Sequence, residues 1–217
     1  MTLAIFDLDN TLIGGDSDKL WGQYLFDQRL VDTTGFAEKN DQFYEDYKAG
    51  TLDIQAYLRF ALGPLKGQPM DVLDSWHKEF MRTIINPIML PKAQELLAKH
   101  RAQGHTLLII TATNVFISRP IATALGIENL LGCEAEIADG RYTGEPTGVA
   151  SYHEGKVIRL NEWLLQTGES MEGAYFYSDS QNDLPLLEIV DNPVAVDPDE
   201  TLKKKALDAG WPILSLR

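Results

Sequence analysis

Two aspartates, Asp7 and Asp9, directly follow the apolar run Leu3 to Phe6 near the start of the chain. Acids two positions apart, at the point where a strand ends, are close enough to serve one site from different sides. One carboxylate of such a pair can attack phosphorus while the other donates a proton to the departing oxygen. A polar turn rich in Asp and Asn explains this fragment equally well on its own.

A second polar segment, Thr111-Ala112-Thr113-Asn114, follows the apolar run Leu107 to Ile110 and precedes a predicted helix. A hydroxyl beside the free backbone N–H groups of a helix start can bind an anion, so Thr111 and Ala112 are candidates for phosphate contacts. An ordinary helix cap is the simpler interpretation of this segment taken alone.

Two further acids, Asp179 and Asp183, lie in the loop after the apolar run Ala174 to Tyr177. Mg²⁺ prefers carboxylate and water oxygens, so this pair indicates a site for a hard cation. A polar loop explains these residues too. However, three strand ends now carry acids or hydroxyls at one edge of a predicted sheet, and chance becomes a poor explanation.

Lys156 follows Gly155 and opens a predicted helix. A lone lysine is ordinarily a solvated surface charge. A cluster of carboxylates that binds a phosphoryl group nevertheless needs a cation besides the metal, and Lys156 is the candidate for that role.

The elements that position these residues are short apolar runs, too short for helices and typical of strands buried on both faces of a parallel sheet. Helical patterns alternate with them, which predicts a doubly wound, Rossmann-like α/β fold. Ligands of such sheets bind beyond the carboxyl ends of the strands. The strand runs are Leu3–Phe6, Leu107–Ile110, Ala174–Tyr177 and Pro193–Val196, and the helical patterns cover Lys92–Gln103 and Val157–Leu165.

Two stretches break this alternation. Asp139-Gly140, between alternating segments from Glu134 to Gly144, predicts a β-hairpin. Residues 14–88 contain no good strand run and instead predict several amphipathic helices, the first of them capped by Ser17. We therefore expect two domains, a Rossmann-like core of residues 1–13 and 89–217 and a helical cap of residues 14–88.

The chain closely resembles the haloacid dehalogenase superfamily, whose four motifs correspond in order to Asp7-x-Asp9-x-Thr11, Thr111, Lys156 and Asp179-x-x-x-Asp183. The helical insertion resembles the C1-type cap of that superfamily. The segments that carry the motifs, together with Asp16-Ser17-Asp18, resemble the IB subfamily and are similar to phosphoserine phosphatases.

The resemblance implies phosphatase chemistry through a covalent intermediate. Asp7 would be the nucleophile and form an aspartyl-phosphate. Asp9 would protonate the leaving alcohol and then activate water. Members that act as dehalogenases lack an acid at this position, because a halide leaves without a proton.

The resemblance also implies Mg²⁺ as cofactor, held by the side chains of Asp7 and Asp179 and by the backbone carbonyl of Asp9. Around the phosphate, Thr111 would bind a phosphoryl oxygen and Lys156 would offset negative charge. The remaining roles fall to Asp183, which would orient the metal waters or Lys156, and to Asn182, which would assist at the phosphate.

The substrate is expected to be a small phosphomonoester that carries an amine. Asp16 lies where similar phosphoserine phosphatases have an acid that contacts the substrate amino group. Histidinol phosphate is favoured, because its amine and imidazole suit an acidic, aromatic insert. Phosphoserine phosphatase, or a less specific phosphatase or phosphotransferase, is the alternative, and the carboxylate of phosphoserine would need a cation such as Arg59, Lys48 or Arg29.

The aromatic residues of the insert have two interpretations. They can wall a pocket for a flat ring, or they can form the core that a small helical domain needs, which is the commoner role. They are Trp21, Tyr24, Phe43, Tyr44, Tyr47, Tyr57, Phe60 and Trp76.

Composition narrows the class of partner. Acidic residues outnumber basic ones by 32 to 19, and a net charge of −13 repels nucleic acid and anionic membranes. No apolar run approaches the ~18 residues of a membrane span, and no basic or apolar leader precedes Leu3. We therefore expect a cytoplasmic enzyme, monomeric or homodimeric. A phospho-acceptor receiver domain uses similar residues, but its attacking Asp would follow a middle strand of a shorter chain.

Overall fold

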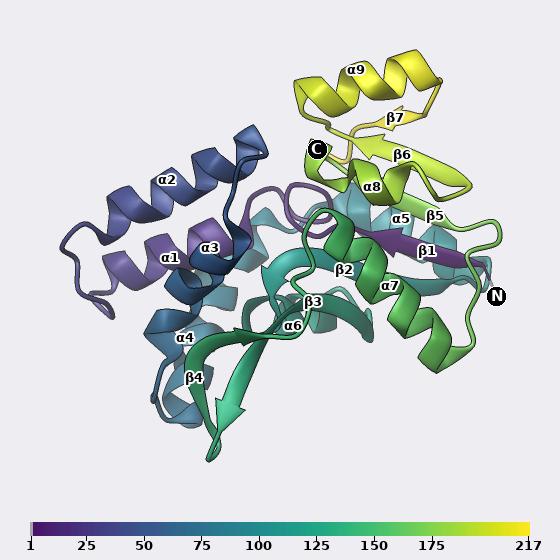
Figure 1. Ribbon diagram of the computed structural model, residues 1–217. Helices are drawn as coiled ribbons and strands as arrows, with labels where there is room; N and C mark the ends of the chain where they lie inside the picture. Colours follow the sequence, from purple (N-terminus) through teal and green to yellow (C-terminus); the bar gives the residue numbers. More distant parts are fainter. Residues whose placement is uncertain (1) are drawn as a thin grey trace.

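The computed structural model describes residues 2–217, and its centre is a seven-stranded sheet in the order β4-β3-β2-β1-β5-β6-β7 (Figure 1). The pairings are parallel except that between β3 and β4, so the predicted doubly wound α/β fold is confirmed. The strands are β1 (Leu3–Phe6), β2 (Thr106–Asn114), β3 (Asn129–Ala138), β4 (Arg141–Thr147), β5 (Tyr175–Ser178), β6 (Asn192–Val196) and β7 (Ile213–Leu214).

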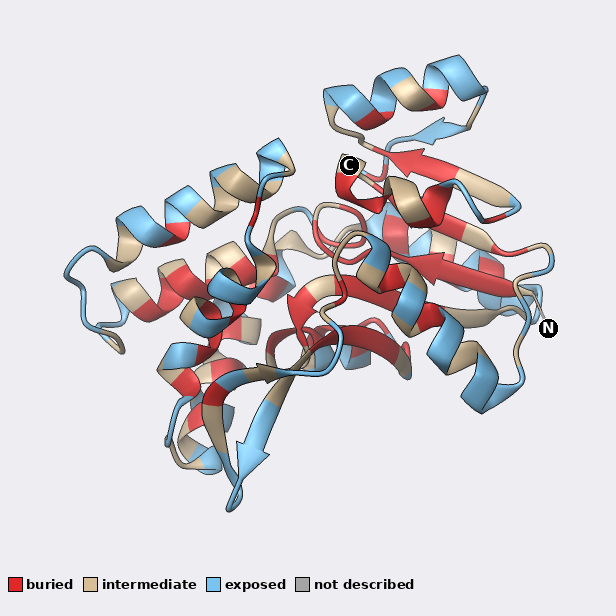
Figure 2. Ribbon diagram, viewed as in Figure 1, coloured by how far each residue is buried: buried red, intermediate tan, exposed pale blue. Residues whose placement is uncertain are grey.

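Helices cover both faces of the sheet, which leaves its central strands buried (Figure 2). Side chains alternate across a strand, so Ala4 and Phe6 of β1 pack on one face, whereas Leu3 and Ile5 pack on the other. The first face is covered by α5 (Pro91–Ala102) and α6 (Val115–Ala124), and the second by α7 (Glu154–Thr167), α8 (Leu184–Leu187) and α9 (Glu200–Ala209).

The predicted strands and helices are present, with shifted ends. β2 continues beyond Ile110 to Asn114 through an irregular register, so the Thr111 segment ends the strand instead of following it. The first half of β3, which pairs in parallel with β2, was missed because its apolar run is only Leu130-Leu131. The hairpin was predicted correctly. Asp139 and Gly140 have φ of 51° and 71°, as both central residues of its tight turn require.

The insert, residues 14–88, is helical as predicted. It contains α1 (Ser17–Asp27), α2 (Phe36–Ala49), α3 (Ile54–Leu62) and α4 (Met70–Phe80), followed by a π-helical turn at Met81–Ile85. The chain enters and leaves it side by side, because Ile13 pairs with Met89, and the Gly14 N–H donates to the Ile88 carbonyl at 2.8 Å.

The apolar core of the insert is continuous with one face of the sheet. Trp21, Leu58 and Phe80 belong to the same buried cluster as Phe6 and Leu97. The division into a core domain (1–13 and 89–217) and a cap domain (14–88) therefore stays a prediction, because one continuous apolar cluster joins the two parts. Residue 1, which that division includes, lies outside the described residues.

The N-cap of α1 was predicted wrongly. Asp16, not Ser17, is the cap, and its carboxylate accepts from the Lys19 N–H at 2.8 Å. Ser17 is instead the first residue of the helix, and its backbone N–H donates to a side-chain oxygen of Asp9 at 2.6 Å. The cap shifts by one residue because Asp9 takes the N–H group at the helix start.

The β3–β4 hairpin braces the insert from outside. Arg59 of α3 pairs with Glu145 of β4 at 2.9 Å, and the Gly67 N–H donates to the Tyr142 carbonyl at 2.9 Å. The insert is thus held by the hairpin as well as by its two connections.

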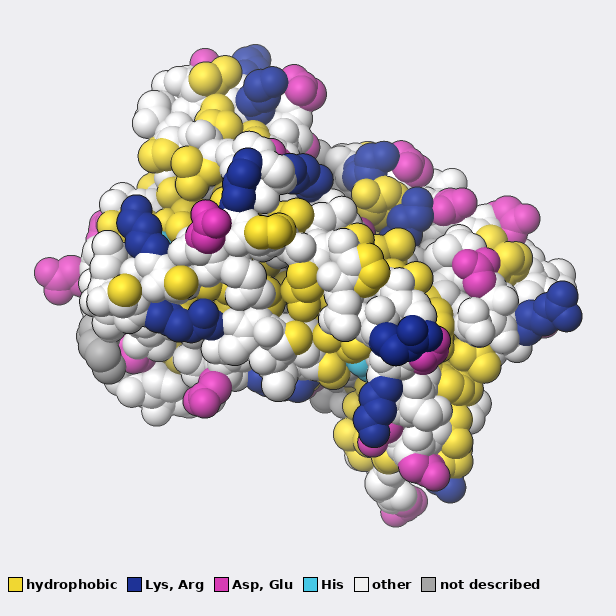
Figure 3. Space-filling model, turned by 180° about the vertical axis from the view of Figure 1, so that it is seen from behind, with side chains coloured by type: hydrophobic (Ala, Val, Ile, Leu, Met, Phe, Trp, Pro, Cys, Tyr) yellow, Lys and Arg dark blue, Asp and Glu magenta, His cyan; other side chains and the backbone are white. Residues whose placement is uncertain are grey.

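On the face drawn in Figure 3, Lys and Arg side chains lie singly or in small groups among acidic and apolar ones. No basic surface of the kind that follows a nucleic acid backbone is visible there. Within residues 2–217, every helix is too short or too polar to cross a bilayer.

Candidate active site

Asp7 lies at the carboxyl end of β1, the central strand. Its backbone N–H donates to the Tyr177 carbonyl of neighbouring β5 at 2.9 Å, and the residue is 3% exposed. The chain leaves β1 toward β2 and returns to β5 on the other side, so the strand order reverses here. Such a switch point opens the crevice in which ligands of open α/β sheets bind.

A buried ion cluster forms around Lys156. Its Nζ lies 2.7 Å from Asp7 Oδ1 and 2.6 Å from Asp183 Oδ1, and all three side chains are at most 4% exposed. The Ser178 hydroxyl donates to Asp183 Oδ2 at 2.7 Å and so holds this acid in place. Burial lowers the pKa of Lys156, but the charges of Asp183 and Asp7 more than offset that effect and raise it overall. Lys156 is therefore charged and fixed.

The carboxylates at this edge repel one another. Burial, together with the charges of Asp183 and Asp9, raises the pKa of Asp7 to about 8, although Lys156 lowers it. Burial and the charges of Asp7 and Asp183 likewise raise the pKa of Asp179 well above its ordinary value. The Thr11 hydroxyl donates to Asp179 Oδ1 at 3.3 Å. The site holds more negative charge than Lys156 alone balances.

Asp9 is held on both of its oxygens. The Ser17 N–H donates to Oδ1 at 2.6 Å, and the Thr113 hydroxyl donates to Oδ2 at 2.7 Å. Thr111 lies further off, with its hydroxyl 3.4 Å from Oδ2. Burial raises the pKa of Asp9. A carboxyl group that keeps its proton more readily than usual suits a general acid.

Thr113 is a site residue that sequence reasoning missed. The signal was its position two residues after Thr111, which places both hydroxyls on the same face of β2. Asn114, the next residue, accepts from the Ile117 N–H at 3.3 Å and caps α6. The phosphate-site and helix-cap interpretations of this segment therefore apply to different residues.

A pocket extends from Asp7 and Asp9 into the helical insert. It joins residues from β1, β2 and the insert, including the predicted site residues Asp16, Thr111 and Ala112. Its walls are Asp7, Asp9, Asp16, Asp18, Lys19, Asn40, Phe43, Tyr44, Tyr47, Leu52, Ile54, Tyr57, Thr111, Ala112 and Thr113.

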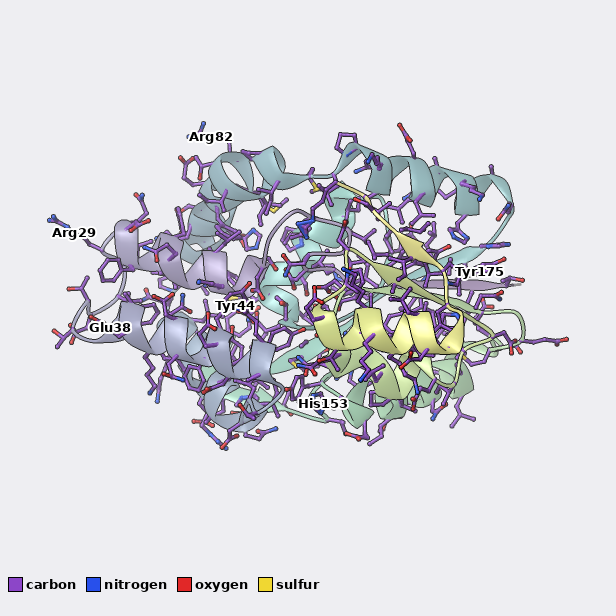
Figure 4. All side chains as sticks on the ribbon, turned by 90° about the horizontal axis from the view of Figure 1, so that it is seen from above. Arg29, Glu38, Tyr44, Arg82, His153 and Tyr175 are labelled. Atoms are coloured by element: carbon purple, nitrogen blue, oxygen red, sulfur yellow. The ribbon has the colours of Figure 1, made fainter. Side chains whose placement is uncertain are left out.

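The aromatic residues of the insert divide between pocket and core. Tyr44 lies where α2 faces the sheet edge (Figure 4). Both interpretations of these aromatic residues are correct, each for a different set of side chains. Phe43, Tyr44, Tyr47 and Tyr57 line the pocket, whereas Trp21, Tyr24, Phe60 and Trp76 pack within the insert or against the apolar cluster.

The charge of the pocket wall is mainly negative. Burial and the charge of Asp9 raise the pKa of Asp16 to about 7. Among residues 2–217, Lys19 is the only basic side chain lining the pocket, and it pairs with Asp41 at 3.3 Å and covers the Tyr44 ring at 4.3 Å.

The cations considered for a substrate carboxylate lie elsewhere. Arg59 pairs with Glu145, and Lys48 pairs with Glu45 at 2.9 Å. Arg29 points outward at the far end of the insert (Figure 4).

Residues 4–188 match the haloacid dehalogenase-like hydrolase family. This chain belongs to that family. The assignment drawn from the four motifs is thereby confirmed.

Relatives of this haloacid dehalogenase-like hydrolase match it over its whole length. A histidinol-phosphatase of Neisseria meningitidis serogroup C (strain 8013) is 47% identical over 219 residues, covering 99% of each chain. A phosphoserine phosphatase of Mycobacterium tuberculosis (strain ATCC 25618 / H37Rv) is 32% identical over 217 residues, covering 99% of this chain and 70% of the relative. The crystal structure of a protein of unknown function from Bordetella pertussis Tohama I superposes with a TM-score of 0.93 at 40% identity, covering 100% of both chains.

Asn182 has a different set of contacts from the one expected at a phosphate. Its Nδ2 donates to the Tyr47 carbonyl at 2.9 Å, and its Oδ1 lies 2.9 Å from His153 Nε2. Gln181 adds a bond from its Nε2 to the Lys48 carbonyl at 2.9 Å. In this hydrolase, the loop after β5 therefore fastens the end of α2 over the site.

Gly155 gives the helix that carries Lys156 its close approach to the preceding loop. A Cβ at this position would lie 1.9 Å from the Ala150 carbonyl oxygen, a backbone atom that cannot turn aside. The position of Lys156, the lysine of the family motif, thus depends on the absence of a side chain at Gly155.

Gly155→Ala is expected to push the start of α7 away from the Ala150 loop. We expect a loss of about 2 kcal/mol in the free energy of unfolding, in line with other overpacked sites, and a fall in kcat because Lys156 moves with its helix. Urea unfolding and steady-state kinetics check both effects. Gly168→Ala is the control. At this position, just beyond the end of α7, an added Cβ would meet no atom within 4 Å, so the change strains the backbone without displacing the helix. Unchanged kcat in Gly155→Ala would contradict the prediction.

Proposed function

We propose that this hydrolase cleaves small phosphomonoesters through a covalent phospho-Asp7 intermediate. The observation that carries the proposal is the arrangement at the sheet edge. A carboxylate is fixed by a buried lysine at 2.7 Å, and a second carboxyl group with a raised pKa lies two residues away in the chain and lines the same pocket.

In the first step, a carboxylate oxygen of Asp7 attacks phosphorus and the bond from phosphorus to the ester oxygen breaks. The proton of Asp9 passes to that oxygen, so the product leaves as an alcohol. In the second step, Asp9, now ionised, takes a proton from water as the water oxygen attacks the phosphoryl group. The bond between phosphorus and the Asp7 oxygen breaks, inorganic phosphate departs, and Asp7 and Asp9 return to their starting states.

Other side chains stabilise charge along this path. Lys156 holds Asp7 in its attacking orientation and offsets the negative charge brought by the substrate. Thr111 lies in the pocket beside Asp9, where its hydroxyl can donate to a phosphoryl oxygen. The insert, fastened over the site by Asn182 and Gln181, excludes bulk water during the first step.

The donor set at the sheet edge fits Mg²⁺. In proteins Mg²⁺ binds one or two carboxylates and completes its shell with waters and substrate phosphates. Asp7 and Asp179 would supply the carboxylates, and the Asp9 backbone carbonyl would be a further donor. When bound, Mg²⁺ would neutralise carboxylate charge and polarise the phosphoryl group.

Removal of metal is expected to silence the enzyme. EDTA should lower kcat/KM more than about 100-fold, because the metal stabilises several kcal/mol of charge in the transition state, and added Mg²⁺ should restore the rate. In Asp179→Asn, half-maximal activation should need about 10-fold more Mg²⁺. Asp208→Asn, on exposed α9, is the control. Turnover that persists in EDTA would remove Asp179 from this role.

We propose histidinol phosphate as the substrate. Its ammonium and imidazole groups match the acids Asp16 and Asp18, and its ring matches aromatic walls such as Tyr57. The 47% identity to the Neisseria histidinol-phosphatase supports the same choice. Phosphoserine would bring a carboxylate toward these acids, and the nearby Lys19 is already paired with Asp41.

Phosphate release from a panel of phosphomonoesters tests this choice. With Mg²⁺ present, we expect kcat/KM for histidinol phosphate of order 10⁴ M⁻¹s⁻¹ or above, within the normal range for enzymes, and at least about 10-fold above that for phosphoserine. A preference for phosphoserine would exclude the proposed substrate and leave the chemistry in place. Weak activity on every ester would leave the substrate proposal without support.

A further inference from the structure

Asp18 is a buried carboxyl group that takes no part in the phosphoryl-transfer steps. It lies in the first turn of α1, two residues beyond Asp16, and is 6% exposed. Its Oδ1 atom is buried without a hydrogen-bond partner, whereas Asp16 uses its carboxylate to cap the helix. An unpartnered buried carboxyl group adds nothing to the stability of a fold, so its presence needs a separate explanation.

The position of Asp18 supplies that explanation. Asp18 lines the pocket that begins at Asp7 and Asp9, and it lies at the part of the wall formed by the insert, together with Tyr57 and Phe43. Tyr57 lines both this pocket and the small cavity behind it together with Asp18. Asp18, one of whose carboxylate oxygens has no partner, therefore lines the same pocket as Asp7 and Asp9, beside aromatic rings.

The acids along this pocket fall in sequence order. Asp9 lies in the loop after β1, Asp16 precedes α1, and Asp18 lies in the first turn of α1. Burial and the charges of Asp16 and Asp9 raise the pKa of Asp18 well above its ordinary value. A cationic or N–H-bearing group beside it would satisfy the acceptor and offset that repulsion.

We propose that Asp18 is the specificity residue that binds the imidazole ring of the substrate through a ring N–H donated to Oδ1. The inference rests on the proposed function. With the phosphate at Asp7 and the substrate amine near Asp16, the ring is the group left to reach Asp18, and Tyr57, on the same pocket wall, lies against the ring.

A buried water is the competing explanation. A small inner cavity shares Asp18, Asn40 and Tyr57 with the pocket, and the buried Trp21 Nε1, also without a partner, borders it. A water in that cavity would make Asp18 a structural residue. The two explanations differ in what Asp18→Asn does to substrates with and without a ring.

The test compares histidinol phosphate with alaninol phosphate, the same amino-alcohol phosphate without the imidazole. Asp18→Asn should lower kcat/KM for histidinol phosphate by about 10- to 100-fold, as expected for loss of a charge-assisted hydrogen bond, and mainly through KM. For alaninol phosphate it should stay within about twofold. Glu38→Gln, an exposed acid on α2 labelled in Figure 4, is the matched control and should change neither.

Thermal unfolding separates recognition from structure. Asp18→Asn removes an uncompensated buried charge, so its Tm should equal or exceed that of the wild type. A lowered Tm with equal losses on both substrates would overturn the proposal in favour of a structural role.

Binding of the product keeps this inference distinct from the proposed function. Calorimetry with histidinol and alaninol requires no turnover. Tighter binding of histidinol by the wild type, lost in Asp18→Asn, supports the role of Asp18 even if histidinol phosphate is hydrolysed poorly. Equal binding of histidinol by both proteins, or none by the wild type, overturns it. Failure of the wild type to hydrolyse either ester would count against the proposed function alone.

Discussion

Replacing Asp7 by Asn is expected to abolish hydrolysis of every phosphomonoester while the protein stays folded. An amide oxygen is a poor nucleophile, so the covalent route closes, and we expect a loss of at least about 10³-fold in kcat. The fold should tolerate the change, because Asn has almost the same volume and because burial already raises the pKa of Asp7 to about 8. Removing a costly buried charge therefore offsets the loss of its bond to Lys156.

Single-turnover phosphate release, with circular dichroism as the check on folding, measures the effect. Rapid acid quench of the wild type with labelled substrate should also trap phosphate on the protein, and Asp7→Asn should trap none. Asp208→Asn, which changes an exposed aspartate on α9, should behave as the wild type. Residual activity above a few per cent in Asp7→Asn would rule out the covalent route.

Lys156→Met is expected to damage both stability and catalysis. Lys156 is 1% exposed and contacts Asp7 and Asp183 at 2.7 Å and 2.6 Å, so its removal leaves buried carboxylates without a counter-charge. Breaking a buried ion pair from one side typically costs about 3–5 kcal/mol. We expect a fall of that size in the free energy of unfolding near pH 8, and a loss of at least about 100-fold in kcat.

The loss of stability in Lys156→Met relative to the wild type is expected to increase with pH. Lys156 lowers the pKa of Asp7, which is nevertheless about 8 because burial raises it. Without Lys156 that pKa rises further, and a carboxyl group whose folded pKa exceeds its unfolded value destabilises the fold more as pH rises between the two values. The stability deficit of Lys156→Met relative to the wild type should therefore grow as pH rises from about 7 to about 9, because Asp7 ionises in the wild type in this range but stays protonated in the variant.

Urea unfolding at the two pH values measures this deficit. Lys203→Met, at a half-exposed lysine on α9, is the control for loss of a surface charge and should differ little from the wild type at either pH. An equal deficit for Lys156→Met at both pH values would mean that packing of the lysine stem, and not its charge, stabilises the cluster.

The sequence alone determined which strands carry polar ends and which residues lie at those ends. The motifs alone identify Asp7, Asp9, Thr111, Lys156, Asp179 and Asp183, and the structure places them around one sheet edge. These signals are local, because a short apolar run followed by an acid or a hydroxyl predicts a strand with a polar end whatever the tertiary contacts of the chain are. Parallel pairing then brings the carboxyl ends together at one edge.

Other features depended on contacts between distant segments. Thr113 was identified only by its bond to Asp9, and Asn182 was found to reach Tyr47, 135 residues away along the chain. The parallel half of β3 was missed because two leucines are too short a run to mark a strand.

The division of the insert's aromatics shows most clearly what tertiary structure decided. Trp21 and Tyr57 have similar sequence signals, yet one lies in the core and the other lines the pocket. Helical spacing shows which residues share a face of a helix, but not what that face meets. The rotation of α1 and α3 against the sheet and against the β3–β4 hairpin decides what each helix face contacts. The same rotation buries Asp18 beside the pocket. Local pattern therefore defined the chemistry, and long-range packing defined the pocket that selects a substrate for it.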